Sequence, residues 1–286
     1  MEKCSALYLV ATPIGNLEDI TLRALRILKE VDLIAAEDTR TSIKLLNHYS
    51  IKNKITSYHK FNEEKKKGEL IEFIKSGKSI ALISDSGTPG ISDPGEILVK
   101  ECIKNNIKVI PVPGPSALIS AVSASGLSTR KIKFIGFLPL KNKERKKILN
   151  ELKTDDSTVV FFETPHKIIK TLNELKEILG KRNIVASKEI TKKFEEFFSG
   201  DINDVIGRIN DKEKIKGEFV IIIEPYIEKK IISDDETFLN MIKGLSSEMK
   251  PKEMILKVSK ELNMPKNKVY KKYLDYMEKL KDEKKN

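Results

Sequence analysis

The sequence predicts an α/β protein made of two consecutive α/β domains followed by a small C-terminal helical extension. Through the first 225 residues, short apolar runs of strand length alternate with segments whose apolar residues recur at helical spacing. This alternation is typical of a parallel sheet with helices on both faces. After Tyr226 the strand pattern stops. We therefore expect domains at 1–125 and 126–225 and an extension at 226–286, with a mostly parallel first sheet and a mixed second sheet.

The first domain contains five apolar runs that predict strands, at Leu7–Ala11, Val31–Ala36, Lys54–Ser57, Ser79–Ile83 and Ile107–Val112. The segments between and after them predict helices at Leu17–Lys29, Thr41–His48, Asn62–Lys75, Pro94–Lys104 and Ser116–Ala124, the last of which closes the domain. The alternation pauses near Gly126, and we place the domain boundary there.

The second domain continues the alternation. Strands are expected at Ile132–Gly136, Thr158–Phe162, Asn183–Ser187, Phe194–Phe198 and Glu218–Ile223, the last two antiparallel because the connections are short. Helices are expected at Asn142–Leu152, His166–Leu179 and Ile202–Ile209. The extension predicts helices at Phe238–Leu245, Lys252–Leu262 and Lys266–Leu280, with a turn at 263–265. Its last two helices resemble a helix-turn-helix, and a helical cap or dimer-forming tail is the alternative.

The composition favours an intracellular protein that binds a polyanion. The net charge is +11 and the isoelectric point is near 9.3, which suits a nucleic acid partner. Two cysteines and three scattered histidines form neither a disulfide framework nor a metal-ligand spacing, so no metal is expected. No apolar run approaches the ~20 residues that span a bilayer, and the first four residues lack an apolar signal core. We expect a soluble, cytoplasmic protein.

Three of the strands in the first domain run into loops rich in glycine and proline. These loops begin at Thr12, Ser84 and Pro113. Glycine lets the backbone approach a ligand closely and proline stiffens the loop, so three such loops favour a single ligand cleft. Neither a G-x-G-x-x-G motif nor a phosphate-binding P-loop is present. No Lys or Arg occurs from Ser79 to Val99, which suits a cationic ligand such as S-adenosylmethionine.

Several motifs, in this order along the chain, resemble one family. They are Ala11–Ala24, Ala35–Arg40, Ser84–Gly95, Pro113–Ala117, Phe161–Lys167, Ser187–Lys192 and Lys216–Glu218. The family is that of bacterial small-subunit (16S) ribosomal RNA cytidine-2′-O-methyltransferases of the methyltransferase I type, in the tetrapyrrole methylase superfamily. The departures are Ser86 where the family commonly has Ala, and Phe162 and Lys167 where Tyr and Arg are frequent. Lys167 matters most because lysine lacks the planar fork that arginine offers a phosphate.

The resemblance implies that S-adenosylmethionine lies between the two domains. Carried onto this sequence, the implied contacts of the first domain are Thr12, Pro13, Ile14, Gly15, Asp85, Gly87, Thr88, Pro89, Ile91, Ser116 and Ala117. The second domain would add Phe162, Ser187 and Gly217. Ser116 can also act as a helix N-cap, and Ile14 and Ile91 can also be ordinary core residues.

Methyl transfer to a hydroxyl group needs a group that accepts the proton. The run Glu37, Asp38, Thr39, Arg40 follows a predicted strand and supplies the first candidates, Glu37, Asp38 and Arg40; helix capping with an ion pair is the alternative. Glu163 and His166 form a second candidate set, and Lys188 and Glu189 are expected to pair with each other. The sequence leaves the identity of the general base open.

The resemblance implies 2′-O-methylation of a cytidine in the decoding region of 16S ribosomal RNA, on the assembled small subunit, by a homodimer. The alternatives are a methylase of the same fold acting on a tetrapyrrole or a diphthamide precursor, and a non-catalytic RNA-binding protein. From Lys250 to Lys272 there are eight lysines and two acidic residues. Because phosphate contacts come mainly from such side chains, we expect RNA contacts at Lys252, Lys266, Lys268, Lys271 and Lys272.

Overall fold

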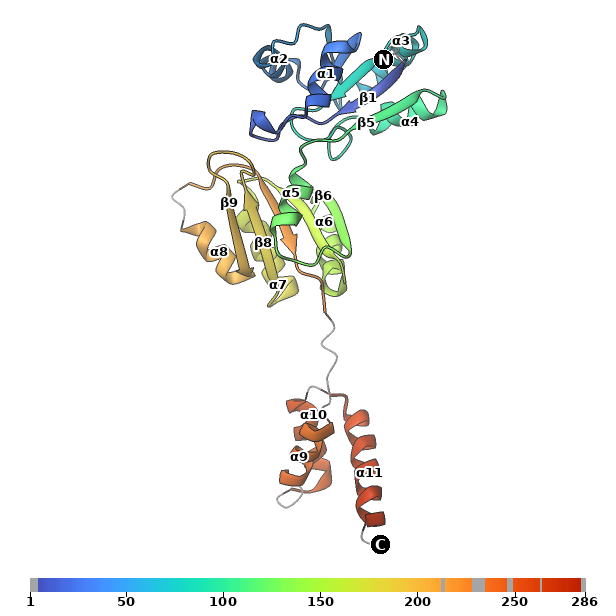
Figure 1. The fold of residues 1–286 in the computed structure, drawn as a ribbon. Coiled ribbons are helices and arrows are strands. Elements are labelled where there is room, and N and C mark those ends of the chain that lie inside the picture. The colour runs from blue at the N-terminus through green and yellow to red at the C-terminus, as the bar shows by residue number, and fades with distance from the viewer. Residues whose placement is uncertain (1–4, 212–213, 228–234, 246–248, 263, 284–286) are drawn as a thin grey trace. The chain divides into compact units, whose positions relative to one another are not determined.

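The computed structural model describes residues 5–211, 214–227, 235–245, 249–262 and 264–283. The chain forms two compact units, Met1–Tyr226 and Ile227–Asn286 (Figure 1). The first unit contains two five-stranded sheets. The second unit consists of helices.

The first sheet is wholly parallel and has the strand order β3 (Ile55–Ser57), β2 (Leu33–Ala36), β4 (Ile80–Ile83), β1 (Ala6–Val10), β5 (Lys108–Val112). Helices α1 (Leu22–Glu30) and α2 (Thr39–His48) pack on one face. Helices α3 (Glu63–Lys75) and α4 (Glu96–Lys104) pack on the other. The sequence prediction of a parallel sheet covered on both faces is therefore confirmed.

The predicted helix at Leu17–Lys29 is divided in the structure. A single 3-10 turn occupies Leu17–Asp19, and α1 starts at Leu22. The interruption has a local cause, because Thr21 has an extended backbone and its side chain accepts a hydrogen bond from the Ala24 N–H. Thr21 is thus the N-cap of a new helix rather than an interior residue.

The second sheet is mixed, as expected. Its order is β6 (Ile132–Phe137), β7 (Thr158–Glu163), β10 (Phe219–Ile223), β8 (Asn183–Lys188), β9 (Glu196–Asp201), and only β6 and β7 are parallel. The last two strands, β9 and β10, each lie in antiparallel pairs, as expected, but they do not pair with each other. Strand β8 lies between β9 and β10 and is antiparallel to both, so these two strands run in the same direction.

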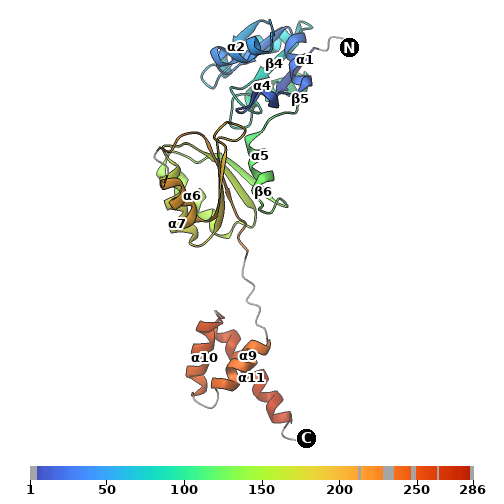
Figure 2. The same ribbon diagram turned by 60° about the vertical axis from the view of Figure 1, so that its left-hand side comes forward.

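Helices cover both faces of the second sheet (Figure 2). One face packs against α6 (Asn142–Glu151), the short 3-10 helix Leu152–Thr154, α7 (Ile168–Leu179) and α8 (Ile202–Asn210). The other face packs against α5 (Ala117–Ala124), whose Ala121 and Val122 contact the apolar residues of β7, β8 and β10. The sequence predicts α5 as the closing helix of the first domain, and in the structure it belongs to the core of the second sheet.

The second unit has a small core of its own. Helices α9 (Asp235–Leu245), α10 (Pro251–Glu261) and α11 (Lys266–Glu283) bury the side chains of Phe238, Ile242, Met254, Ile255, Val258, Met264 and Val269. The three predicted helices are present. The predicted turn includes Asn263, which lies outside the described residues.

In the part of the chain that the structure describes, no helix is long and apolar enough to cross a membrane. Cys102 is a buried free thiol. Cys4 lies outside the described residues, as do the other three of the first four residues, on which the signal-peptide expectation rests.

Candidate active site

The three glycine- and proline-rich loops meet at the carboxyl edge of the first sheet. The Thr12 N–H donates to the Gly87 carbonyl (2.9 Å) and the Gly87 N–H to the Thr12 carbonyl (3.0 Å). The Thr88 hydroxyl lies 3.4 Å from the Pro115 carbonyl, which joins the third loop. Gly87 has a φ of +77°, a left-handed conformation that favours glycine. The sequence prediction that these loops share one site is therefore consistent with their contacts.

A pocket of about 250 Å³ opens beside these loops. It is lined by the loops that follow strands of the first sheet, by the start of α5, and by strands and loops of the second sheet. The lining residues are Ile14, Ser86, Gly87, Thr88, Ile91, Ser92, Asp93, Ser116, Ala117, Leu118, Phe137, Phe162, Glu163, Thr164, Pro165, Glu189, Ile190, Lys192, Glu218, Phe219 and Val220. The lining combines apolar side chains, small loop residues and four carboxylates, which is the mixture typical of small-molecule sites.

The sequence-predicted cofactor residues fall into two groups. Those that line the pocket are Ile14, Gly87, Thr88, Ile91, Ser116, Ala117 and Phe162. The others, Thr12, Pro13, Gly15, Asp85, Pro89, Ser187 and Gly217, are absent from the lining of this pocket. Thr12 joins two of the loops through its backbone hydrogen bonds with Gly87. Ser187 is buried, and its hydroxyl donates to the Val220 carbonyl (3.1 Å). Ser116 also accepts a hydrogen bond from the Ile119 N–H, so it is the N-cap of α5 as well.

Two of these glycines allow close approach between loops. A Cβ at Gly15 would lie 2.3 Å from Lys192 Cγ and 3.2 Å from the Ile190 carbonyl. A Cβ at Gly217, where φ is +89°, would lie 2.4 Å from Glu189 Cγ. The loop after β1 therefore presses directly on the loop after β8, and the Asn16 N–H donates to the Thr191 hydroxyl across this contact (3.2 Å).

The cation of the pocket, Lys192, is neutralised by its neighbours. Its ammonium donates to Glu189 (2.8 Å) and to Glu218 (3.1 Å). Burial would raise the pKa of Glu189, but hydrogen bonds from Lys192 and from the Glu218 N–H hold it below the ordinary 4.5. The predicted ion pair between Lys188 and Glu189 is replaced by this one, because the turn after β8 brings Lys192 back over Glu189.

Asp38 and Arg40 serve the start of α2. Asp38 caps the helix by accepting from the Arg40 N–H (2.8 Å), and the Arg40 guanidinium donates to both of its carboxylate oxygens (3.1 and 2.7 Å). The hydrogen bonds from Arg40 lower the pKa of Asp38 to about 2. Such a carboxylate is a weak base, so the alternative of capping with an ion pair accounts for both residues.

Hydrogen bonds connect Glu37 and Asp85 and join the segment after β2 to the loop after β4. The Asp85 N–H donates to Glu37 (3.4 Å), and Asp85 accepts from the Asp38 N–H (3.1 Å). Burial raises the pKa of both Glu37 and Asp85 above their ordinary values. Neither residue lines the pocket.

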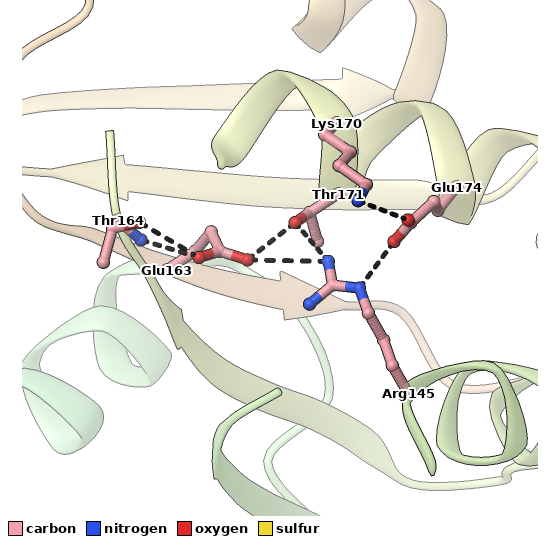
Figure 3. A network of polar contacts seen from close by, with 6 residues as sticks. All are labelled: Arg145, Glu163, Thr164, Lys170, Thr171 and Glu174. Carbon is pink, nitrogen blue, oxygen red and sulfur yellow. Dashed lines mark hydrogen bonds and ion pairs between the residues drawn. The ribbon is translucent and has the colours of Figure 1, made fainter. Parts of the chain in front are cut away.

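Glu163 lines the pocket and belongs to a buried network (Figure 3). One of its oxygens accepts from the Thr164 N–H (2.8 Å) and the other from the Thr171 hydroxyl (2.6 Å). Arg145, from α6, approaches Glu163 to 3.8 Å and donates to Thr171 (2.5 Å) and to Glu174 (2.7 Å). Both carboxylate oxygens of Glu163 are therefore engaged, and they hold the Thr164–Pro165 rim of the pocket. His166 is exposed and is not among the lining residues.

Asp93 lines the pocket but was not among the candidate site residues predicted from the sequence. It is half-buried, and burial first, then the negative charges of Glu37, Asp85 and Glu218, raise its pKa to about 6. The Ser84–Gly95 motif contained it, but the implied cofactor contacts stopped at Ile91. Lys192 and Phe137 were also not predicted from the sequence as pocket residues. Both are far in sequence from the three loops, and only the folding of the chain brings them to the pocket.

Comparisons with known proteins agree with this architecture. The family model described as Tetrapyrrole (Corrin/Porphyrin) Methylases matches residues 6–206. A solved structure of diphthine synthase aligns with a TM-score of 0.58 at 14% identity, covering 77% of this chain and 90% of that one. Uroporphyrin-III C-methyl transferase from Thermus thermophilus, complexed with S-adenyl homocysteine, aligns with a TM-score of 0.53 at 18% identity, covering 76% and 96%. At these identities the structures show the fold alone.

Three relatives, all named Ribosomal RNA small subunit methyltransferase I, are much more similar. The protein of Halalkalibacterium halodurans is 44% identical over 92% of this chain and 93% of its own, and that of Bacillus subtilis is 43% identical over 93% of each. The protein of Thermotoga maritima is 46% identical over 76% of this chain and 97% of its own. The chain therefore belongs to the tetrapyrrole methylase family and, within it, to the ribosomal RNA small subunit methyltransferase I family.

Proposed function

We propose that the protein transfers the methyl group of S-adenosylmethionine to the 2′-hydroxyl of a cytidine ribose in 16S ribosomal RNA. The observation that carries this proposal is the 43–44% identity, over more than nine-tenths of both chains, to relatives named Ribosomal RNA small subunit methyltransferase I. The ribose oxygen, the cytidine and the decoding region are the finer expectations that the motif resemblance implies. The assembled small subunit is the proposed substrate.

The pocket lining fits S-adenosylmethionine. Ile14, Ile91 and Phe162 offer apolar contact for an adenosine, and Gly87 leaves the backbone of its loop open to a ligand. A sulfonium is favoured by carboxylates and disfavoured by free cations, and the lining has four carboxylates with its single lysine neutralised. We propose that these residues, with Thr88, Ser116 and Ala117, hold the cofactor. When bound, S-adenosylmethionine supplies an electrophilic methyl group.

Thr88→Arg tests the cofactor site. The arginine adds bulk and an unpaired cation to a side chain that lines the pocket, so we expect the affinity for S-adenosylmethionine in calorimetry to fall at least tenfold. Ser123→Arg is the matched control, because Ser123 is exposed on α5 and is absent from the lining. Equal affinity in the two variants, both folded by circular dichroism, would remove the pocket assignment.

The reaction is tested on the ribose itself. Methylation of a 2′-oxygen prevents its attack on the neighbouring phosphate, so the product should resist alkaline cleavage at one cytidine of small-subunit RNA. Purified small subunits lacking this modification, incubated with the protein and S-adenosylmethionine, should acquire that resistance. A methyl group found on the base, or an unchanged cleavage pattern, would contradict the proposal.

The alternatives receive less support. The methylases of tetrapyrroles and diphthine synthase share the fold at 14–18% identity only, whereas the RNA methyltransferases match at 41–46%. A non-catalytic protein would not need a lined pocket at the meeting point of three intact loops. We further propose a homodimer, which sedimentation at working concentration would test, since a monomer there would contradict it.

We propose that the helical unit contacts RNA phosphates. Lys252, Lys266, Lys268 and Lys271 are exposed on α10 and α11. Lys272 is half-buried, and its ammonium lies 5.6 Å from the centre of the Phe238 ring, so part of its side chain belongs to the core of the unit. The four exposed lysines are therefore the better candidates.

A further inference from the structure

Transfer of a methyl group to a ribose hydroxyl releases one proton, and the proposed function leaves open which group takes it. The general base must reach the hydroxyl in the pocket and must be free to accept a proton. Four carboxylates line the pocket, Asp93, Glu163, Glu189 and Glu218, and their surroundings distinguish them.

Three of the four already have cationic partners. Glu163 is buried, with both oxygens hydrogen-bonded and Arg145 beside it. Glu189 and Glu218 share the ammonium of Lys192. Within the described residues, no ion pair is found for Asp93, and the charged groups that act on it most strongly are the carboxylates Glu37, Asp85 and Glu218. Asp93 is thus the lining carboxylate left available to accept a proton.

The backbone around Asp93 is tightly constrained. Ser92 has a φ of +66°, which is rare for a residue with a side chain and marks local strain. Gly136, in the bulge of β6 and with φ +76°, makes room for Ser92, because a Cβ there would lie 3.0 Å from Ser92 Oγ. On the other side of Asp93, a Cβ at Gly95 would lie 3.1 Å from the Gly90 nitrogen. Strain maintained by such packing is characteristic of functional sites.

We infer that Asp93 is the general base that accepts the proton of the ribose 2′-hydroxyl, an inference that rests on the proposed function. As the bond from the 2′-oxygen to the methyl carbon forms, the carbon–sulfur bond breaks and its electron pair stays on sulfur. The hydroxyl proton moves to an Asp93 carboxylate oxygen and then to solvent, and the products are the 2′-O-methyl ribose and S-adenosylhomocysteine.

The charges around Asp93 suit this role. Glu37 directly follows β2, Glu218 directly precedes β10, and Asp85 lies in the loop after β4; the negative charges of all three act on Asp93. Together with burial they raise its pKa to about 6, and the nearby Ser84 hydroxyl opposes the rise. A base with a pKa closer to the working pH accepts a proton more effectively than an ordinary carboxylate and is still ionised at neutral pH.

Single-turnover methylation of small subunits tests the inference directly. We expect Asp93→Asn to slow the chemical step by about 10²–10⁴-fold, the usual contribution of a general base, with affinity for S-adenosylmethionine changed less than tenfold. The wild-type rate should rise with pH with an inflection near or below 6, and the Asn variant should lose it. Asp93→Glu should recover part of the rate. Glu96→Gln, which removes an exposed carboxylate three residues away, should leave the rate unchanged.

Calorimetry gives a readout that does not depend on turnover. At pH 6, binding of the sulfonium cofactor should lower the pKa of a nearby half-protonated Asp93 and release up to ~0.5 proton per site. Binding of the neutral S-adenosylhomocysteine should release less. The release is measured from binding enthalpies in two buffers with different ionisation enthalpies, and Asp93→Asn should abolish the difference between the two ligands.

The outcomes separate the inference from the proposed function. If the wild-type protein methylates no RNA, the proposed function fails. If the wild type is active and Asp93→Asn turns over within threefold of it, the assignment of Asp93 as base fails. A third outcome is an Asp93→Asn variant that binds the cofactor poorly but reacts at the wild-type rate once it is saturated with S-adenosylmethionine. That result would assign Asp93 to cofactor binding and would also overturn the inference. If Glu37→Gln abolishes the pH inflection and Asp93→Asn does not, the base is Glu37.

Discussion

Asp38 and Asp93 lie in the same α/β domain, yet their surroundings move their pKa values in opposite directions. Hydrogen bonds from Arg40, two residues away, lower the pKa of Asp38 to about 2. Burial among other carboxylates raises the pKa of Asp93 to about 6. Two carboxylates whose environments separate their pKa values in this way have different roles. Asp38 stabilises a helix start, and Asp93 is available for proton transfer.

The raised pKa of Asp93 predicts how the free energy of unfolding depends on pH. The folded protein binds this proton more tightly than the unfolded chain, whose pKa is near 3.8, so this group lowers the stability as the pH rises from about 4 to about 6. Asp93→Asn should therefore be more stable than wild type at pH 7–8 and nearly equal to it below pH 4. Because Asp93 is half-exposed, the gain should be well under the ~3 kcal/mol of an unscreened shift.

Urea unfolding of both proteins at several pH values measures this effect. Glu96→Gln is the control, because Lys100 lowers rather than raises the pKa of that exposed carboxyl, and it should show no gain at neutral pH. A gain for Asp93→Asn that is as large at pH 4 as at pH 8 would show that the amide acts by packing and not by removing a buried charge.

Some site residues were predictable from the sequence and others were not. Gly87 and Thr88 follow a strand in a glycine- and proline-rich run, so local sequence indicates their place at the edge of the sheet. Lys192 reaches the same pocket only because the loop after β8 packs on the loop after β1. The role of Asp93 depends on carboxylates from three other segments. Such long-range proximity leaves no local pattern in the sequence.

At the level of elements, the network around Arg145 connects α6, α7 and the end of β7 (Figure 3). The Arg145 and Glu163 side chains are 7% and 4% exposed. Arg145→Met keeps an unbranched side chain but leaves the Glu163 carboxylate buried without its cation. We expect a loss of about 3–5 kcal/mol in the free energy of unfolding, the usual cost of breaking a buried pair.

The double variant Arg145→Met with Glu163→Gln should recover part of this loss, because the buried charge is then gone as well. Lys170→Met is the control, since Lys170 is 67% exposed and its pair with Glu174 spans 3.9 Å; it should cost at most about 1 kcal/mol. Urea denaturation of the four proteins provides the comparison. An Arg145→Met variant no less stable than Lys170→Met would mean that water reaches Glu163.

The contact between the loops after β1 and β8 is tested by Gly15→Ala. The new methyl group would overlap Lys192 Cγ and lie close to the Ile190 carbonyl, so the Lys192 side chain or the loop that carries it must shift. We expect weaker binding of S-adenosylmethionine in calorimetry. Gly68→Ala is the matched control, because a Cβ at this helical position of α3 meets nothing within 4 Å; it should stabilise by about 0.5–1 kcal/mol. Equal cofactor binding in both variants would show that this loop contact does not shape the site.

The elements themselves followed from local patterns, whereas their pairing did not. Strands such as β4 and β10 are continuous apolar runs, which identifies them without reference to the rest of the chain. Strand β8 lies between β9 and β10 and pairs with both. The pairing of β8 with β10 joins segments that are distant in sequence, so the lengths of the connections do not predict it. The same holds for α5, which follows the first sheet in sequence but buries its apolar face on the second.

For the whole molecule, the boundary near Tyr226 separates two units with cores of their own. The Thermotoga maritima relative matches 76% of this chain over 97% of its own length. That family member therefore has no counterpart for about a quarter of this chain. Tyr226 itself belongs to the first unit, because its N–H donates to the Asp155 carbonyl (2.7 Å) and the Arg182 guanidinium lies 5.3 Å from its ring centre. A truncation should therefore end after Tyr226.

Removal of residues 227–286 should leave the affinity for S-adenosylmethionine within about twofold of wild type, because the pocket lies entirely in the first unit. Binding to small subunits should weaken and become less dependent on salt.

Each lost phosphate contact reduces the slope of log K against log salt by about 0.7–0.9, so replacing Lys252, Lys266, Lys268 and Lys271 with Gln in the full chain should reduce it by about 3. Four exposed lysines of the first unit, Lys29, Lys52, Lys100 and Lys104, replaced in the same way, provide the control. If the truncated protein methylates small subunits as well as the full chain at moderate salt, the helices serve as a cap or a dimer contact, and sedimentation of the truncated protein would then distinguish these two roles.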